Sequence, residues 1–327
     1  MALPKYKSFL GIAKEPSHAA GVAPTATDPV DFIPVNSLAP FDNIKYLDDE
    51  NWRGSMVKTY GTTQGPIHAE FEFGGTVYPD TIGYAVAGVL GDVVKSGATA
   101  PYTYAVSTLN SGNGQTTSYT LTDYNAVNER QFAGCQFGSV GFKFNADGLL
   151  EYTAMAQGFK SATKTPVATP SYSAVTQMPV WEGSTSINGS AALNLSEGEI
   201  NIKRDLTPIF TVNNSQDPYQ IFQGAVEVDG SLMLVMEDDT QLTYYLNNTQ
   251  PALDIDFTQG TGATLTQIKF HLTKCAFEVA KVTRSKDYVE LSVNFKGIAN
   301  TTDAGASGGY SPIKVTLQNA KATNVYS

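Results

Sequence analysis

The sequence predicts a mainly β protein built from two similar units in tandem, each a β-sheet with one helix packed against it. Three observations predict this: the composition, an internal repeat and frequent alternation of apolar and polar residues. The 327 residues include 29 glycines, 16 prolines, 17 tyrosines and 16 phenylalanines, which favour strands and turns over helices. A chain of this length suits two domains of about 100 to 200 residues each.

The internal repeat is the strongest of the three observations. Segment 147–159 matches segment 286–298, which aligns Glu151 with Glu290 at an offset of 139 residues. Further matches keep the same order along the chain: Gly158 with Gly297, Cys135 with Cys275, Tyr172 with Tyr310, Phe71–Val77 with Val226–Leu232 at an offset of 155, and Asn43–Lys45 with Asn201–Lys203 at 158. Because the matches are collinear, we predict a duplication, with a first domain of residues 1–178 and a second of residues 179–327.

Strands are predicted where apolar and polar residues alternate, or where β-branched and aromatic residues gather. The predicted strands are 69–73, 117–123, 136–144 and 149–156 in the first unit, and 225–228, 253–257, 268–282 and 288–295 in the second. Segments 145–148 and 284–287 lie between strands and are predicted as hairpin turns.

One helix is predicted in each unit. In the first, Pro79 suits the first helical position, apolar residues recur at helical spacing as far as Leu90, and Gly91 ends the helix. In the second, an acidic start and apolar residues at similar spacing predict a shorter helix of the same plan over 237–246.

Segment 45–67 has neither clean alternation nor helical periodicity, and it predicts a long projecting loop. An ordinary surface loop and a contact arm both remain open, and Trp52 among charged residues favours the contact arm. The candidate contact residues are Asp48, Asp49, Glu50, Trp52 and Arg53, with Arg204, Asp205, Asn213 and Asn214 in a shorter counterpart loop over 204–218.

No catalytic, metal or cofactor site is predicted. His18, His68 and His271 are the only histidines, and none has a metal-ligand neighbour at helical or hairpin spacing. Segment 305–309 fits the G-x-S-x-G pattern, but it lacks the following helix that a nucleophile elbow requires, so a Gly-Ser loop is favoured. Acidic runs 48–50 and 237–239 lack the alternating carboxylates of a calcium loop. No phosphate-binding glycine motif occurs.

Charge and hydropathy narrow the class further. The net charge of −10 argues against a protein that grips nucleic acid, because such proteins neutralise phosphates with clustered Lys and Arg. Charged residues make up only 16% of the chain, which indicates subunit interfaces that hide uncharged surface. Without a long apolar stretch or a signal-like start, the sequence predicts a soluble protein made in the cytoplasm. The two cysteines support no disulfide framework.

A string of short motifs then resembles one family. The motifs are 32–35 (FIPV), 46–49 (YLDD), 53–55 (RGS), 73–75 (FGG), 78–84 (YPDTIGY), 90–92 (LGD), 109–112 (LNSG) and 144–152 (FNADGLLEY). Together they resemble the major tail proteins, or tail tube subunits, of long-tailed bacteriophages. The resemblance spans nearly all of the first unit. The second unit is assigned to the same family mainly because it repeats the first.

The resemblance implies β-sandwich or barrel-like domains, each with a flanking helix, that close into rings and stack into a hollow tube for genome passage. It implies no catalytic residue and no cofactor, a place in the virion tail without a sheath, and no membrane. Partners would be further copies, other tail proteins at the tube ends, and tape-measure protein and double-stranded DNA passing through without specific binding. Because such rings present six copies of the fold, a duplicated chain predicts a homotrimeric ring with pseudo-sixfold symmetry.

Two other classes compete with this interpretation. A β-sandwich module that binds carbohydrate or a cell surface could use the tyrosines as stacking platforms, but they scatter through strand patterns rather than gather in one loop set. A β-rich hydrolase lacks a plausible nucleophile and base. The sequence therefore favours a structural protein of the tail, with contacts between stacked rings assigned to the projecting loop and its counterpart.

Overall fold

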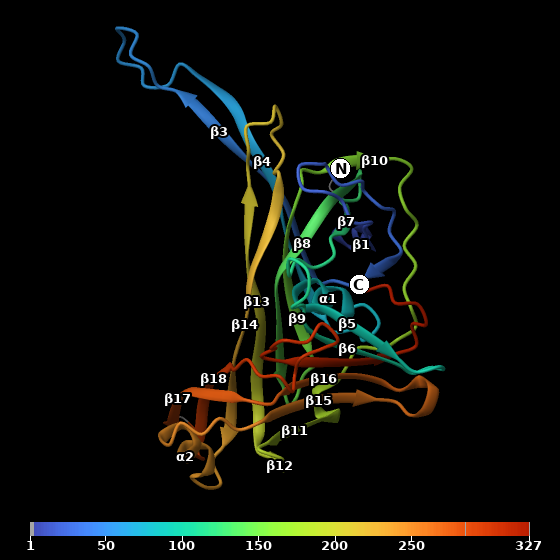
Figure 1. The fold of residues 1–327 in the computed structure, drawn as a ribbon, viewed down its shortest axis with the longest axis vertical. Helices are drawn as coiled ribbons and strands as arrows, with labels where there is room; N and C mark the ends of the chain where they lie inside the picture. Colours follow the sequence, from blue (N-terminus) through green and yellow to red (C-terminus); the bar gives the residue numbers. More distant parts are fainter. Residues whose placement is uncertain (1–2, 285, 327) are drawn as a thin grey trace.

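The computed structural model describes residues 3–284 and 286–326, and it confirms a mainly β fold. A 12-stranded sheet runs along the long axis, and a 7-stranded sheet crosses its lower part (Figure 1). The two sheets pack through aromatic contacts, with Phe142 4.8 Å from Phe270 and Phe144 5.5 Å from Phe257 between ring centroids. The arrangement is sandwich-like, and the sheets do not close into the barrel that was the other expectation.

Most strands of the first half belong to the 12-stranded sheet. The elements of this half are η1 (Lys5–Lys7), β1 (Phe9–Lys14), β2 (Asp31–Ile33), β3 (Ser37–Asp49), β4 (Gly61–Thr76), α1 (Gly83–Leu90), β5 (Gly91–Ser96), β6 (Tyr102–Thr108), β7 (Tyr119–Tyr124), β8 (Glu129–Asn145), β9 (Glu151–Gly158) and β10 (Ala162–Lys164). Strands β5 and β6 belong to the 7-stranded sheet and the other strands to the 12-stranded sheet.

Elements of the second half follow a similar sequence. They are η2 (Val180–Glu182), β11 (Gly183–Ile187), β12 (Ser190–Ala191), β13 (Leu195–Ile209), β14 (Gln220–Val235), α2 (Thr240–Leu246), β15 (Leu253–Gln259), η3 (Gly262–Thr264), β16 (Thr266–Leu272), β17 (Cys275–Thr283), β18 (Glu290–Gly297) and β19 (Lys314–Asn319). The predicted strand 268–282 is therefore two strands, broken at residues 273–274. Ser285, within the second predicted turn, lies outside the described residues.

The two halves pair their strands of the 12-stranded sheet in the same order. The first half runs β3-β4-β9-β8 and the second β13-β14-β18-β17, all antiparallel. Bulges recur at matching places: β8 at 137–139 and β17 at 277–279, β3 at 44–46 and β13 at 204–206. This shared order agrees with the repeat seen in the sequence.

Strand pairing corrects part of the predicted alignment between the halves. Thr76 lies opposite Glu151, and Val235 lies opposite Glu290, so β4 and β14 correspond at an offset of 159 rather than 155. The bulges of β3 and β13 place Ile44 against Arg204, an offset of 160 rather than 158. The offsets of 140 for β8 and β17 and 139 for β9 and β18 agree with the strand pairing.

The two halves share both sheets instead of forming separate sheets. β8 of the first half pairs with β13 of the second from Ser139↔Lys203 to Asn145↔Glu197, and β6 pairs with β19. The C-terminal segment also crosses over, because the buried Tyr326 side chain packs 5.1 Å from Tyr84 and 4.9 Å from Tyr104. The division into domains 1–178 and 179–327 stays a prediction.

Both predicted helices exist, with different starts. Pro79 to Ile82 form turns and α1 begins only at Gly83, because Tyr78 O accepts the amides of both Thr81 and Ile82 before regular helical pairing starts. Gly91, at φ 90°, ends α1 as predicted, since that backbone conformation favours glycine. All eight residues of α1 are buried, whereas none of the seven residues of α2 is.

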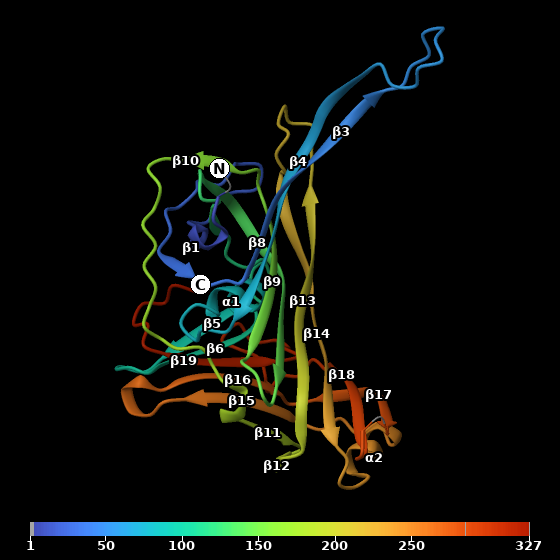
Figure 2. The same ribbon diagram turned by 180° about the vertical axis from the view of Figure 1, so that it is seen from behind.

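The predicted projecting loop is mostly a β-hairpin. β3 continues to Asp49 and β4 begins at Gly61, so only residues 50–60 form its irregular tip. Backbone pairing extends the strands where the side chains do not alternate, because the arm has no buried face to impose alternation. This hairpin and the shorter β13–β14 hairpin reach toward the same end of the molecule, whereas α2 lies at the other end (Figures 1 and 2).

Candidate functional site

The open face of the 12-stranded sheet, away from the 7-stranded sheet, is polar and acidic. Cross-strand pairing places eight carboxylates and four lysines of its strands on it: Glu70, Glu72, Glu151, Glu197, Glu199, Glu227, Asp229, Glu290, Lys143, Lys203, Lys281 and Lys296. Lys143 lies 3.6 Å from Glu199 and Lys203 lies 2.7 Å from Asp229, so part of the charge is paired. The remaining excess is negative.

The tip of the β3–β4 hairpin brings the five predicted contact residues close together. Asp48 and Asp49 end β3, and Asp49 pairs with Arg53 across the start of the tip. Glu50 lies 3.1 Å from Lys58, and the Trp52 side chain is 100% exposed. An apolar ring with no cover in the isolated chain is what a contact surface for another molecule would present.

The four predicted residues of the second-half counterpart lie in different surroundings. Asp205 is exposed on β13, and Asn213 and Asn214 lie in the tip of the β13–β14 hairpin. Arg204, however, is only 8% exposed and cannot contact a stacked copy. Two residues after the buried Ile202, it falls on the inward face of β13, so strand alternation was the signal that could have excluded it.

The buried guanidinium of Arg204 binds the first half of the chain. It donates to the carbonyl oxygens of Val89 at 3.3 Å, Gly114 at 2.9 Å and Gly224 at 2.8 Å. Gln223 reaches the same helix, because its Nε2 donates to the carbonyl oxygen of Gly88 at 3.1 Å. Burial lowers the pKa of Arg204. These bonds fix α1 against β13 and β14, and no sequence motif predicts them.

The two four-strand sets join through the β8–β13 pairing into one eight-strand path, β3-β4-β9-β8-β13-β14-β18-β17. The two end strands of this path, β3 and β17, each have one edge that is unpaired within the described chain. In the part of the chain that the structure describes, no strand pairs with the outer edge of β3 or with that of β17. A groove of about 1540 Å³ lies beside β3, between residues 34–42 and residues 172–177. Edge strands offer rows of unpaired backbone donors and acceptors, so both edges can accept a further strand.

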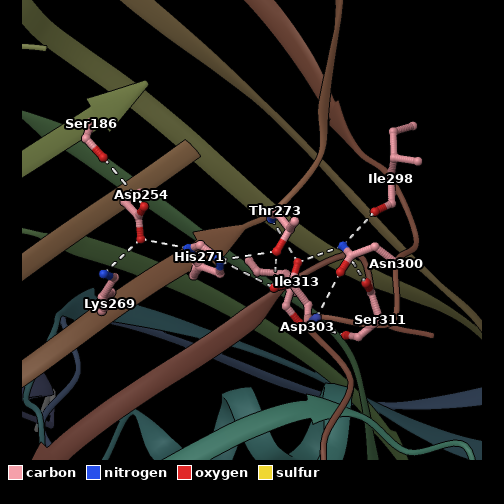
Figure 3. Close-up of polar contacts among 10 residues, drawn as sticks. All are labelled: Ser186, Asp254, Lys269, His271, Thr273, Ile298, Asn300, Asp303, Ser311 and Ile313. Carbon is pink, nitrogen blue, oxygen red and sulfur yellow. Dashed lines mark hydrogen bonds and ion pairs between the residues drawn. The ribbon is translucent and has the colours of Figure 1, made fainter. Parts of the chain in front are cut away.

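A polar cluster around His271 is the arrangement closest to a catalytic one (Figure 3). His271 Nδ1 lies 2.7 Å from Asp254, and Thr273 Oγ1 lies 3.2 Å from His271 Nε2. His271 Nε2 also lies 3.6 Å from Asp303 Oδ1. Sequence spacing could not reveal these neighbours, because Asp254 lies on β15 and Asp303 lies in the loop between β18 and β19. Burial acts to raise the pKa of Asp254, but hydrogen bonds from Lys269 and His271 bring it below its ordinary value.

The same cluster is better suited to holding a loop than to activating a nucleophile. The Thr273 hydroxyl donates to the buried Asp303 at 2.8 Å, so its proton is bound to a carboxylate instead of to His271. Asp303 also accepts from the Thr273 amide and from Asn300 Nδ2. The cluster therefore ties β16 to the 298–313 loop. Among the described residues, no group of three or more metal-ligating side chains could hold an ion.

The two remaining sequence candidates also have structural explanations. Ser307 of the G-x-S-x-G segment lies in a loop, where its amide donates to Asp92 and its hydroxyl accepts from the Asn110 amide at 3.0 Å. Cys135 and Cys275 are free thiols on β8 and β17, and burial raises the pKa of both. Each contributes to the core as a small apolar residue.

Comparison with known families decides the assignment. A family model described as phage tail tube protein matches residues 6–297. The chain belongs to this family. Curated proteins gave no match to the chain. Membership assigns a tail tube protein a structural role in the phage tail, a place in the virion, and self-assembly together with other tail components.

Family membership agrees with the edges and hairpins of this fold. A tail tube protein needs surfaces that bind other copies, and this one has two unpaired edges and two projecting hairpins among its described residues. Over residues 3–284 and 286–326, no helix is long and apolar enough to cross a bilayer. The family is generally non-enzymatic, in keeping with the structural part that the His271 cluster plays here.

Proposed function

We propose that this tail tube protein closes into a homotrimeric ring of pseudo-sixfold symmetry, and that stacked rings form the tube through which the genome passes. One observation carries the proposal: the β8–β13 pairing within the chain joins the last strand of one four-strand set to the first strand of the next. β17 is the last strand of the second set and β3 the first strand of the first set. Pairing β17 with β3 of the next copy repeats the internal junction.

The internal junction also predicts the register between copies. Within the chain, Lys143 of β8 lies opposite Glu199 of β13. The offsets of 140 and 160 given by strand pairing convert this pair into Thr283 opposite Ala39 of the next copy. A heterologous contact of this kind closes into a ring when its rotation allows, and closure removes both free edges.

In such a ring the acidic open face of the sheet would line the channel. The 7-stranded sheet covers the opposite face, so only the open face is free to surround a lumen. An excess of carboxylates repels DNA phosphates and keeps the passing genome from binding to the wall. Charge reversal of Glu72, Glu151 and Glu197 should slow DNA ejection. Unchanged ejection by phages carrying that triple variant would contradict the repulsive lining.

Contacts between stacked rings would use the two hairpins, which reach beyond the same end of the molecule. Asp48, Asp49, Glu50, Trp52 and Arg53 would make the larger contact, and Asp205, Asn213 and Asn214 the smaller. Replacing residues 50–60 by a two-residue Asn-Gly turn keeps the paired parts of β3 and β4, so rings should form but not stack. Tubes of normal length from this variant would show that the hairpin tip is not needed for stacking.

Disulfide trapping tests the ring directly. Ala39→Cys with Thr283→Cys should cross-link copies under oxidation, because directly opposed residues lie close enough for a disulfide. The control, Ala39→Cys with Lys281→Cys, shifts the register by two residues and should cross-link far less. Denaturing gels should show a ladder that ends at the trimer, and electron microscopy should show rings. A ladder that ends at six, or rings of six full-length chains, would reject the trimer.

A further inference from the structure

Apolar side chains are incompletely covered at both ends of the eight-strand path, at β17 with α2 and at the groove beside β3. The two ends correspond to the two sides of the internal β8–β13 junction. We infer that α2 and the inner face of β17 of one copy pack into the groove beside β3 of the next copy. This inference rests on the proposed ring. It adds a helix to the contact between copies, which would otherwise consist of the paired edges of β17 and β3 alone.

The opening at the β17 end has apolar side chains with incomplete cover. Leu242 and Tyr244 of α2 and Ala280 and Val282 of β17 pack on the core but are only partly buried. Leu246, the last residue of α2, is 70% exposed. A seven-residue helix with no buried residue has little packing to hold it, so a partner surface would stabilise it.

The opening at the β3 end is the groove of about 1540 Å³. Leu38 and Pro40 line its strand side, and Tyr172 to Gln177 line the opposite side. At the offset of 160, Leu38, Pro40 and Asp42 of β3 correspond to Gly198, Ile200 and Ile202 of β13. Asp42 is bound to Ser161 and Arg130, so the apolar part of this wall is Leu38 and Pro40. Ile200 is buried in the core at the internal junction, whereas the equivalent Pro40 faces the groove without that cover.

The internal junction shows which element gives that cover. α1 packs beneath β8, where a Cβ on Gly88 would come within 2.3 Å of Phe137. α2 packs beneath β17 in the same way, with Tyr244 6.4 Å from Phe277, the residue that corresponds to Phe137. α1 then reaches across to β13 and β14, whose Arg204 and Gln223 bind its last carbonyl groups. Among the described residues of its own chain, α2 has no such partner.

The next copy offers a matching residue for this contact. Gln223 lies opposite Leu206, just beyond the bulge of β13, and Gln64 lies opposite Tyr46, just beyond the bulge of β3. Gln64 is exposed. In the ring its amide would lie at the C-terminal turn of α2, as that of Gln223 does at the C-terminal turn of α1.

Photo-cross-linking from the groove identifies its occupant. Tyr172→p-benzoylphenylalanine places the reactive group on the groove wall of the full-length chain, and Tyr310→p-benzoylphenylalanine is the control at the repeat-equivalent tyrosine, which is 63% exposed. In assembled rings we expect products from position 172, but not from 310, that join two copies through residues 240–246 or 275–284. Products that join the groove to residues 50–60 would overturn the inference, since a stacked copy would then occupy it. Products within one copy alone would also overturn it.

A matched pair of leucine variants separates this inference from the ring itself. Leu246→Glu should lower the yield of rings at least tenfold, whereas Leu193→Glu, at an exposed leucine before β13, should leave the yield within twofold. Equal urea midpoints of both monomers would show that folding is unaffected. Rings formed normally by Leu246→Glu would refute the packing of α2 but keep the ring. Failure of the unmodified chain to form rings would refute the ring.

Discussion

The two helices hold corresponding places in the two halves, yet their surroundings are opposite. α1 lies under β8 with all eight residues buried, and it is covered by β13, β14 and the C-terminal segment. α2 lies under β17 with none of its seven residues buried. The difference comes from the neighbour of each unit: the second half covers the first, whereas no third unit among the described residues covers the second. In the proposed ring, the next copy would cover the second half as the second half covers the first within the chain.

The largest expected effect concerns the C-terminal segment that covers α1. Tyr326→Ala should lower the free energy of unfolding by about 3 to 5 kcal/mol, because it removes a fully buried ring and leaves a cavity. The lost hydroxyl also donates to the carbonyl oxygen of Asp80 at 2.7 Å. Urea denaturation of the monomer measures the change. Tyr310→Ala, at an exposed tyrosine, should stay within about 0.5 kcal/mol, and equal losses for both would contradict a special part for Tyr326.

Substitution of the last leucine of each helix allows a direct comparison of how strongly the two helices are packed. Leu90 is fully buried and Leu246 is exposed. Leu90→Ala should cost about 2 to 5 kcal/mol of monomer stability, whereas Leu246→Ala should cost less than about 0.5 kcal/mol. Chemical denaturation below the assembly concentration checks both. Similar losses in the two variants would mean that α2 is already packed within the single chain.

Removing the guanidinium that joins α1 to the second half should have a smaller effect. Arg204→Met keeps the apolar stem but leaves three carbonyl oxygens without that donor, at a cost of about 2 to 3 kcal/mol. Arg204→Lys should not restore stability, because an ammonium lacks the planar fork. Lys203→Met, at the exposed neighbour, is the control. A fully stable Arg204→Met protein would show that α1 needs no bond from β13.

The smallest expected effect is a pH dependence of the stability of the first half. It comes from Asp123 on β7, a strand that has no counterpart among the described residues of the second half. Burial raises the pKa of Asp123 to about 6, with Arg130 acting in the opposite direction. The unfolded value is about 3.9, so the folded state holds the proton more tightly, and stability should fall as pH rises from about 4 to 6. Asp123→Asn should remove about 1 to 2 kcal/mol of this fall. Identical urea midpoints against pH for both proteins would contradict it.

The sequence predicted the β-rich class, the existence of both helices and most central strands, because these depend on local alternation and spacing. It misaligned the first hairpins of the two halves by about four residues on β4 and two on β3, as the strand pairing shows. Both errors are even numbers, and an even slip along a strand leaves every side chain on its correct face, so alternation could not detect it. The pairing with neighbouring strands, including the bulges, fixes the register.

Of the candidate residues, the exposure of those in the first hairpin could be predicted because the charges around Trp52 depart from any buried pattern, whereas their part in a contact stays a prediction. Arg204 was misplaced because its charge suggested a surface, although alternation placed it inward. The free edges of β3 and β17 and the uncovered face of α2 could not be predicted, since an unpaired edge is defined by the strand that is missing. Tyr326 was also missed, because a single tyrosine outside any strand has no periodicity to mark it.

The position of Tyr326 has a consequence for the order of events in the infected cell. The core around α1 is complete only when Tyr326, 246 residues after Asp80, has left the ribosome and entered it. A nascent chain therefore cannot finish folding its first half before the second half has been made. Subunits cut short before Tyr326 would carry a destabilised first half, because the aromatic cover of α1 would be missing.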